Sequence, residues 1–299
     1  MLRLLFIVSL CFLFCSDGDA KITSLTLTNG DRIPCSLVDY QLNTDVVTVR
    51  AEEGKTRRLK GAQLDDDSFR AVRDWDAVRQ FNNPEKFRVY VNGPNELNSW
   101  IKYLWYRPPG KVQPGKTYEI DFERWAYELK MDNRTGYDLE NIELVYNVYY
   151  NQMRMDWTVE ERVTDVIVRP CRETYAILPN ELSEQVMLKS VVLRDKEIMY
   201  DPYGGQWRAD ILEYLQADNR FLRAEFLGMA LQIKLTDAQG QVHVREGRYP
   251  DELAADLVWT EPTEENVVWA DDFIDEQTDI STPPTRFEEM GGADEDEDA

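Results

Sequence analysis

The fold class rests on one stretch, residues 139–150, which reads LENIELVYNVYY. Apolar side chains recur there at every second position, at Ile142, Leu144, Tyr146, Val148 and Tyr150. Successive side chains of a β-strand point to opposite faces, so this phase predicts a strand with one face against a core. Turn signals rich in Asn, Pro and Gly recur around it from residue 86 to residue 260. Their spacing predicts an all-β region at 86–260 that folds as a β-sandwich.

Two other strands of this region change their apolar phase partway along. In residues 118–131 the apolar positions pass from even to odd numbers near Glu123 and Arg124, which predicts a β-bulge there. In residues 222–233 the change falls at Gly228, which predicts either a second bulge or a strand that bends from one sheet to the other. Residues 207–215 have helical spacing instead, and predict one short helix over an open end of the sandwich.

The N-terminal part of the chain carries shorter alternating runs. Residues 22–59 alternate apolar and polar positions and predict a meander of about five short strands. Asn29-Gly30-Asp31 is a strong hairpin signal, because both central residues of a type I′ turn need a positive φ. Large apolar residues then recur three apart in residues 67–82, which predicts one amphipathic helix that ends before Pro84.

Residues 21–66 resemble the Sla-type homology domain, an SH3-like small β-barrel of exported bacterial proteins. The likeness is carried by Asn29-Gly30-Asp31 and its flanking strands, residues 46–50, Gly54-Lys55, and residues 64–67 leading to Phe69. The aromatic residue that usually leads this family is missing. The resemblance implies a module that makes contacts and has no catalytic centre. The spacing in residues 67–82 places a helix and linker at 67–85 after it.

Residues 86–260 resemble, at the level of fold, the immunoglobulin-like or fibronectin-like β-sandwiches of exported bacterial proteins. The likeness is carried by residues 129–133, 139–144 and 227–234 and by Tyr249-Pro250. It implies a binding or presenting scaffold, and fold alone does not fix function. The turn after the first of these strands contains Asn133-Arg134-Thr135, which fits a glycosylation sequon.

The first twenty residues have the layout of a secretory signal, with Arg3, an apolar run at 4–15 and small residues before the end. A signal peptidase reads this pattern, so cleavage is expected after Ala20 and the mature chain is expected to be secreted or periplasmic. A retained anchor is disfavoured because a transmembrane helix needs about 20 apolar residues. Lipid attachment at Cys11 or Cys15 is disfavoured by the bulky residue before each cysteine.

Charge is distributed unevenly along the chain. The formal net charge is -22, and residues 261–299 hold fifteen acidic residues against one basic residue, Arg286. No basic patch is left to release counterions from phosphates, which argues against a nucleic-acid partner. Residues 261–299 are too acidic and too poor in apolar residues to form a core, and predict a disordered acidic tail. Its apolar exceptions, Val267-Val268-Trp269 and Phe273-Ile274, are able to dock on a partner or on the protein's own sheet.

The sequence contains few combinations of residues that could support catalysis. The single histidine, His243, lies in an alternating strand and is expected to face solvent if the flanking valines belong to the core. One histidine supports neither a Ser-His-Asp triad nor a His-rich metal site. A glycoside hydrolase needs two carboxylates about 5 to 9.5 Å apart, and the candidates are Asp210, Glu213 and Glu225. We assign no catalytic residue, metal ligand or cofactor site.

The aromatic cluster Trp100, Tyr103, Trp105 and Tyr106 is the candidate binding face. Tyr103 and Trp105 share one face of an alternating segment, and Trp100 and Tyr106 share the other. Both faces are buried only if the strand lies between two layers, so one face is a candidate surface for sugar rings or a partner peptide. A buried sandwich core is the alternative.

Cys35 and Cys171 are the only cysteines left after cleavage of the leader. In an oxidising compartment they are a candidate disulfide pair, and the alternative is that each is a small buried apolar residue.

These patterns predict an exported, non-enzymatic binding or scaffold protein that contacts a partner protein or an envelope component. It is expected to need no cofactor and, without its leader, to have no integral membrane span. The alternative is a carbohydrate-binding protein that uses the exposed aromatic face, with or without carboxylate-dependent hydrolysis of glycans.

Overall fold

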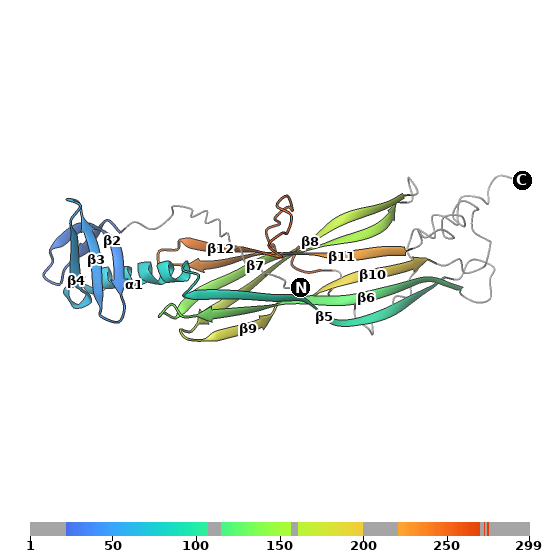
Figure 1. The fold of residues 1–299 in the computed structure, drawn as a ribbon, viewed down its shortest axis with the longest axis horizontal. Coiled ribbons are helices and arrows are strands. Elements are labelled where there is room, and N and C mark those ends of the chain that lie inside the picture. Colours follow the sequence, from blue (N-terminus) through green and yellow to red (C-terminus); the bar gives the residue numbers. More distant parts are fainter. Residues whose placement is uncertain are drawn as a thin grey trace, which may run out of the picture. The chain divides into compact units, whose positions relative to one another are not determined.

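The computed structural model describes residues 22–106, 115–156, 161–199 and 221–269, together with Asp272 and Ile274. The signal-like residues 1–20, the predicted helix at 207–215 and the chain after 274 lie outside this part. This part contains twelve strands, which form antiparallel sheets, and one α-helix (Figure 1). The predicted all-β class is therefore confirmed. The chain divides into two compact units, Met1–Arg79 and Gln80–Ala299, here called unit 1 and unit 2.

Unit 1 contains a four-stranded antiparallel sheet in the order β1-β2-β3-β4. These strands are β1 (Ser24–Thr26), β2 (Arg32–Gln41), β3 (Val46–Ala51) and β4 (Thr56–Lys60). The predicted hairpin at Asn29-Gly30-Asp31 links β1 to β2. Gly30 has a φ of 88°, but Asn29 is not among the described residues with a positive φ, so the turn is not the predicted type I′. A 3-10 helix, η1 (Gly61–Gln63), follows β4. An isolated antiparallel bridge then pairs Leu64, directly after η1, with Leu27, directly after β1. Over its described residues the sheet does not close into the predicted barrel.

The helix α1 (Asp66–Phe81) has nearly the predicted bounds. Asp65 caps it, because its Oδ1 accepts the Ser68 N–H at 2.8 Å. The Ser68 hydroxyl oxygen in turn accepts the Thr26 N–H at 2.9 Å and ties the helix to β1. Val72 is fully buried, so the apolar face of the helix belongs to the core as its spacing predicts.

Unit 2 contains eight strands that pair antiparallel in the order β5-β6-β10-β11-β7-β8, with β9 beside β6 and β12 beside β11. They are β5 (Phe87–Tyr106), β6 (Gly115–Asn133), β7 (Leu139–Asp156), β8 (Glu161–Leu178), β9 (Ser183–Met187), β10 (Val191–Met199), β11 (Phe221–Thr236) and β12 (Val242–Tyr249).

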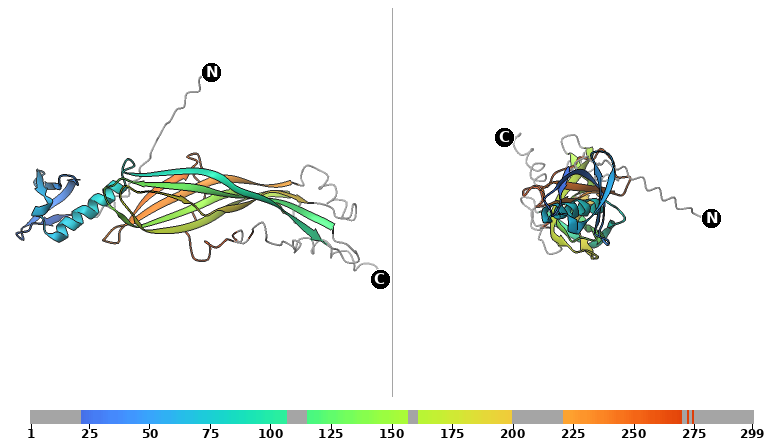
Figure 2. Two further views of the ribbon diagram at one scale, coloured as in Figure 1. Left: turned by 90° about the horizontal axis from the view of Figure 1, so that it is seen from below. Right: turned by 90° about the vertical axis from the view of Figure 1, so that its left-hand side faces the viewer.

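These strands form two layers (Figure 2). Hydrogen-bonded pairing between neighbouring strands continues from one layer into the other. At one end the layers face each other, and Tyr127 of β6 packs on Phe226 of β11 with ring centroids 5.6 Å apart. The Tyr127 hydroxyl also donates to the Tyr249 carbonyl of β12 at 3.2 Å. Strand β10 pairs with both β6 and β11 and so joins the layers, a connection that the alternating pattern of single strands did not reveal.

Strand β7 is a central strand and confirms the predicted phase. The five residues of that phase, Ile142, Leu144, Tyr146, Val148 and Tyr150, are all at most 3% exposed. Val145, Asn147 and Tyr149 on the opposite face are buried as well. The chain after β12 crosses this second face, and the Tyr149 hydroxyl donates to the Val258 carbonyl at 3.3 Å. Both faces of β7 are therefore covered.

One predicted bulge is confirmed, and the other lies in different strands. The register of β11 against β7 shifts between Phe226 and Gly228, where Gly228 has a φ of 150°. Near residues 123–124, however, β6 pairs without an inserted residue, and the extra residues are Leu97 in β5 and Asp195 in β10. A bulge needs only two residues on one strand opposite one on its partner, so the neighbours of β6 absorb the mismatch.

The condition under which His243 is expected to face solvent is not met in β12. Val242 and Val244 are exposed, and the inward positions carry His243 and Arg245 instead. The His243 side chain is 9% exposed, and its Nε2 lies 2.9 Å from Asp237 Oδ2. Arg245 donates to two backbone carbonyls of unit 2. Polar side chains are tolerated on the inner face because each has a hydrogen-bonding partner there.

Candidate functional site

The predicted aromatic surface lies on β5, and its first residue is part of a buried layer. Trp100 is 6% exposed and stacks on Phe122, with ring centroids 5.5 Å apart and planes inclined by 13°. The Arg124 guanidinium lies 5.5 Å from the centroid of the Trp100 ring. In this conformation Trp100 is not available to stack on a ligand. The side chains of the other three predicted residues, Tyr103, Trp105 and Tyr106, lie outside the described part of the chain.

The outer edge of β5 is open, because β6 is the one described strand that pairs with it. In the first half of β5, Pro94 and two register irregularities interrupt the ladder. From residue 98 to residue 104 the pairing with β6 is unbroken. Ile101, in the middle of this run, is 51% exposed. This run therefore presents a regular backbone edge with an apolar side chain, which is the template that an added strand needs.

A second feature is the strap, defined here as residues 259–269 together with Asp272 and Ile274. The predicted acidic tail begins at residue 261. Of the apolar residues predicted to dock, Trp269 is buried on the protein itself, Val268 is exposed, and Phe273 lies outside the described residues. Pro262 and Trp269 are both buried.

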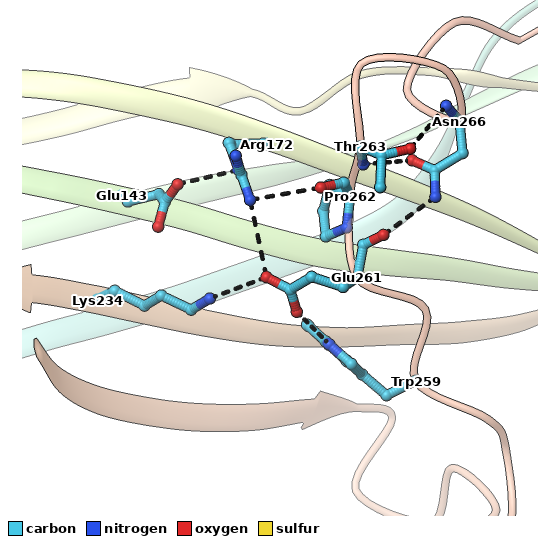
Figure 3. Close-up of polar contacts among 8 residues, drawn as sticks. All are labelled: Glu143, Arg172, Lys234, Trp259, Glu261, Pro262, Thr263 and Asn266. Carbon is cyan, nitrogen blue, oxygen red and sulfur yellow. Dashed lines mark hydrogen bonds and ion pairs between the residues drawn. The ribbon is translucent and has the colours of Figure 1, made fainter.

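Glu261 forms the first anchor of the strap (Figure 3). Its Oε1 lies 3.3 Å from Lys234 Nζ on β11 and 3.7 Å from Arg172 Nη2 on β8, and its Oε2 accepts the Trp259 indole N–H at 3.0 Å. The indole hydrogen bond, helped by the two cations, lowers the pKa of the Glu261 carboxyl against the opposing effect of burial. Arg172 also donates to the Pro262 carbonyl at 3.4 Å. One acidic residue thus ties the strap to two strands.

A capped turn follows this anchor (Figure 3). The Thr263 N–H donates to Asn266 Oδ1 at 2.6 Å, and the Asn266 N–H donates to Thr263 Oγ1 at 3.3 Å. Asn266 Nδ2 also donates to the Glu261 carbonyl at 3.0 Å. The two exposed acidic residues inside the turn, Glu264 and Glu265, lie at its solvent side.

Lys189, between β9 and β10, holds the second anchor. Its Nζ lies 4.0 Å from the centroid of the Trp269 ring and 2.7 Å from Asp272 Oδ2, and it donates to the Val267 carbonyl at 2.6 Å. The Trp269 N–H donates to the same carboxylate oxygen at 3.0 Å. A cation between an aromatic face and a carboxylate in a partly desolvated site is strongly attracted to both.

The strap approaches the layer that contains Trp100. Arg124, which lies over Trp100, donates from Nη2 to the Ile274 carbonyl at 3.1 Å. The indole N–H groups of Trp100 and Trp269 are both buried, and neither has an acceptor among the described residues. The sequence indicated Trp269 as an apolar exception of the acidic tail and Trp100 as part of an aromatic face, but it did not indicate the cations that meet them.

A buried polar group lies behind Lys189. The Tyr146 hydroxyl donates to Glu173 Oε1 at 2.7 Å, and it accepts a hydrogen bond from the backbone N–H of Lys189 at 2.9 Å. Burial, with the nearby Cys171 and Glu173, raises the pKa of Tyr146 far above its ordinary value. Cys171 and Cys35, the candidate disulfide pair, are both free and buried in the structure, and burial raises the pKa of each thiol. Thiols held neutral in this way are weak nucleophiles.

The candidates for carboxylate and metal chemistry do not assemble within the described part. Glu225 lies on β11 opposite Asn151 of β7, whereas Asp210 and Glu213 lie outside the described residues. No group of three His, Cys, Asp or Glu residues in the described ranges is placed to hold a metal ion. None of the described helices is long and apolar enough to cross a membrane.

No family model and no curated protein matches the chain. Among solved structures, it is similar to target SoR45 of the Northeast Structural Genomics Consortium, at 11% identity and a TM-score of 0.19, over 60% of this chain and 95% of that chain. It is also similar to the sporulation control protein Spo0M from Bacillus subtilis, at 10% identity and a TM-score of 0.18, over 55% of this chain and 47% of that chain. Likeness at this level supports no argument about fold or function.

Proposed function

We propose that the protein is an exported, non-enzymatic binding protein that contacts a partner protein through the open edge of β5. The observation that carries this proposal is the unbroken run 98–104, which has no strand on its outer side in the described chain and exposes 51% of Ile101. An open edge offers backbone donors and acceptors to an incoming strand, and exposed apolar side chains add specificity. Export itself rests on the signal-like residues 1–20.

The described titratable groups support binding rather than catalysis. His243 is held by Asp237, and Glu173 accepts hydrogen bonds from two tyrosine hydroxyls. General acid–base catalysis needs a group within reach of a substrate proton and with a pKa near the working pH. We therefore assign no catalytic role to His243 or Glu173 in this proposal. Unit 1, with its four-stranded sheet, is proposed as a second, SH3-like contact module.

A pull-down from envelope extracts with the full chain tests the proposal. We expect Ile101→Lys to remove the captured partner, because a cation in the middle of the edge opposes an apolar strand. The matched control is Val166→Lys, at a residue that is 50% exposed on β8, the other edge strand of the sheet path. Recovery of no partner by the wild-type chain, or equal loss with both variants, contradicts the proposal.

An envelope polysaccharide is the alternative partner. The same full chain on a polysaccharide panel distinguishes the two, with Trp105→Ala as the variant. Binding that this variant removes, without loss of any captured protein, favours the carbohydrate over strand addition.

A further inference from the structure

We infer that unit 2 carries a receptor site for an acidic peptide of the pattern Trp-x-x-Asp, and that the strap occupies this site in cis. Lys189 forms the centre of the site, and its present occupants are Trp269 and Asp272. Arg124 lies at its border, where it donates to the Ile274 carbonyl. The ligand class is an acidic linear segment of a partner protein. The inference goes beyond the edge of β5, because it concerns different residues and a different type of ligand.

Lys189 is the strongest evidence for a built site. Its ammonium contacts a ring face, a carboxylate oxygen and a backbone carbonyl, and all three belong to the strap. Through these contacts Lys189 recognises an aromatic residue together with an acidic residue three positions later. Asp272 also accepts the Trp269 N–H at 3.0 Å, so the four-residue unit presents ring and carboxylate together. Recognition is therefore local to a short motif, as in other linear-peptide sites.

Charge complementarity supports the same ligand class. The body of the chain, residues 21–260, has 39 acidic and 32 basic residues, a net charge of -7, so it is not basic as a whole. Yet four cations of the body meet the strap: Arg124, Arg172, Lys189 and Lys234. A local basic track on an acidic protein selects acidic segments and disfavours basic ones.

The strap is an imperfect ligand for its own site. The Trp269 indole N–H is buried without an acceptor among the described residues, and an unmade buried hydrogen bond weakens docking. Between the anchors, Glu264, Glu265 and Val268 are exposed, so the strap is held at separate points. A partner peptide that supplies the missing acceptor has an advantage at the same site.

Tethering explains why an imperfect ligand still fills the site. A short linker gives an effective concentration of roughly 1 mM, so a segment with a dissociation constant of about 10 μM suppresses a competing peptide about 100-fold. An outside peptide of equal affinity is therefore excluded from the intact chain. Once the strap is weakened, the site opens.

A labelled peptide of residues 256–276 and the full chain test this inference by fluorescence anisotropy. The strap is weakened by Trp269→Ala with Asp272→Asn, and we expect this variant to bind the peptide at least about tenfold more tightly than the wild-type chain. Adding Lys189→Met to the weakened chain is expected to remove about tenfold or more of the affinity. Lys130→Met, at an exposed lysine of β6, is the matched control and is expected to leave binding unchanged.

Three results overturn the inference. The first is no peptide binding by the weakened chain while circular dichroism shows it folded. The second is equal binding with Lys189→Met and Lys130→Met. The third is concentration-dependent dimerisation of the wild-type chain, measured by light scattering and abolished by Trp269→Ala, because the occupant is then a second copy. Each is independent of the Ile101→Lys result, so failure here and failure of the proposed function are distinguishable.

Discussion

Asn133 joins three segments of unit 2 through one side chain, and its replacement is our most quantitative prediction. The residue ends β6 and is 0% exposed. Its Nδ2 lies 2.9 Å from the Tyr137 carbonyl, 2.9 Å from the Leu178 carbonyl and 3.1 Å from the Pro179 carbonyl. Its Oδ1 accepts the Thr135 N–H at 3.1 Å and the Thr135 hydroxyl at 2.7 Å. The amide therefore ties the β6–β7 turn to the end of β8.

The expected cost of Asn133→Ala follows from these bonds. Two N–H hydrogens serve the three carbonyls and the oxygen accepts twice, so about four hydrogen bonds are lost. At about 1 kcal/mol each, the free energy of unfolding should fall by about 4 kcal/mol. Thr135→Val removes one bond to Asn133 and should cost about 1 to 2 kcal/mol. The double variant should then show a coupling of about 1 kcal/mol, because the two residues share that bond.

Urea unfolding followed by tryptophan fluorescence measures this loss. Seven of the eight tryptophans lie in unit 2, so the signal reports mainly on that unit. Asn98→Ala, at an exposed asparagine of β5, is the control and should change stability by no more than about 0.5 kcal/mol. A loss below about 1 kcal/mol for Asn133→Ala refutes the reasoning. The same burial predicts that the sequon at Asn133 carries no glycan on the folded chain, which mass spectrometry of material from a glycosylating host checks.

Three further predictions concern strain, acid and thiol chemistry. Gly228→Ala should cost about 3 kcal/mol or more in a urea melt, because φ is 150° and an added Cβ would lie 2.4 Å from the Tyr249 carbonyl oxygen; Gly240→Ala, with φ of 80° and open space, should cost about 1 kcal/mol. Burial raises the pKa of Asp237, but hydrogen bonds from His243 and two backbone N–H groups outweigh it and the net shift is downward. The stabilisation by this carboxylate is therefore complete above its ordinary pKa of 3.8 and lost as pH falls through the lower folded value, so the stability gap between wild type and Asp237→Asn should shrink below about pH 4. Both cysteine thiols should resist iodoacetamide at neutral pH in the native chain and react once it is unfolded, as peptide mass mapping can show.

The features that sequence predicted correctly depend on residues close together in the chain. The alternation in residues 139–150 gave the inward face of β7, and the spacing in residues 67–82 gave the helix α1. Gly228 marked a bulge because its own backbone needs a conformation that other residues avoid. In each case the cause lies within one element, so the pattern and the structure agree.

The features that sequence missed depend on pairing between distant segments. The phase change in β6 is real, but the inserted residues lie in β5 and β10, and only their pairing with β6 shows this. Alternation along β12 does not say which of its two faces is inner. His243 lies inside because Asp237, at the preceding turn, supplies a partner at 2.9 Å. A side-chain partner outside the periodic segment therefore decides the face.

The strap shows why composition alone misjudges an acidic segment. Fifteen acids in residues 261–299 argue against a core. One tryptophan of this segment is nevertheless buried, and a lysine of the body covers its ring. The acids then favour docking, since Glu261 and Asp272 each meet a cation of unit 2. The unpaired indole N–H of Trp269 limits the strength of that docking. The strap is therefore held by two charged anchors and by a tryptophan whose indole N–H lacks an acceptor among the described residues. A segment held in this way can be displaced by a competing acidic peptide, as the inferred receptor site requires.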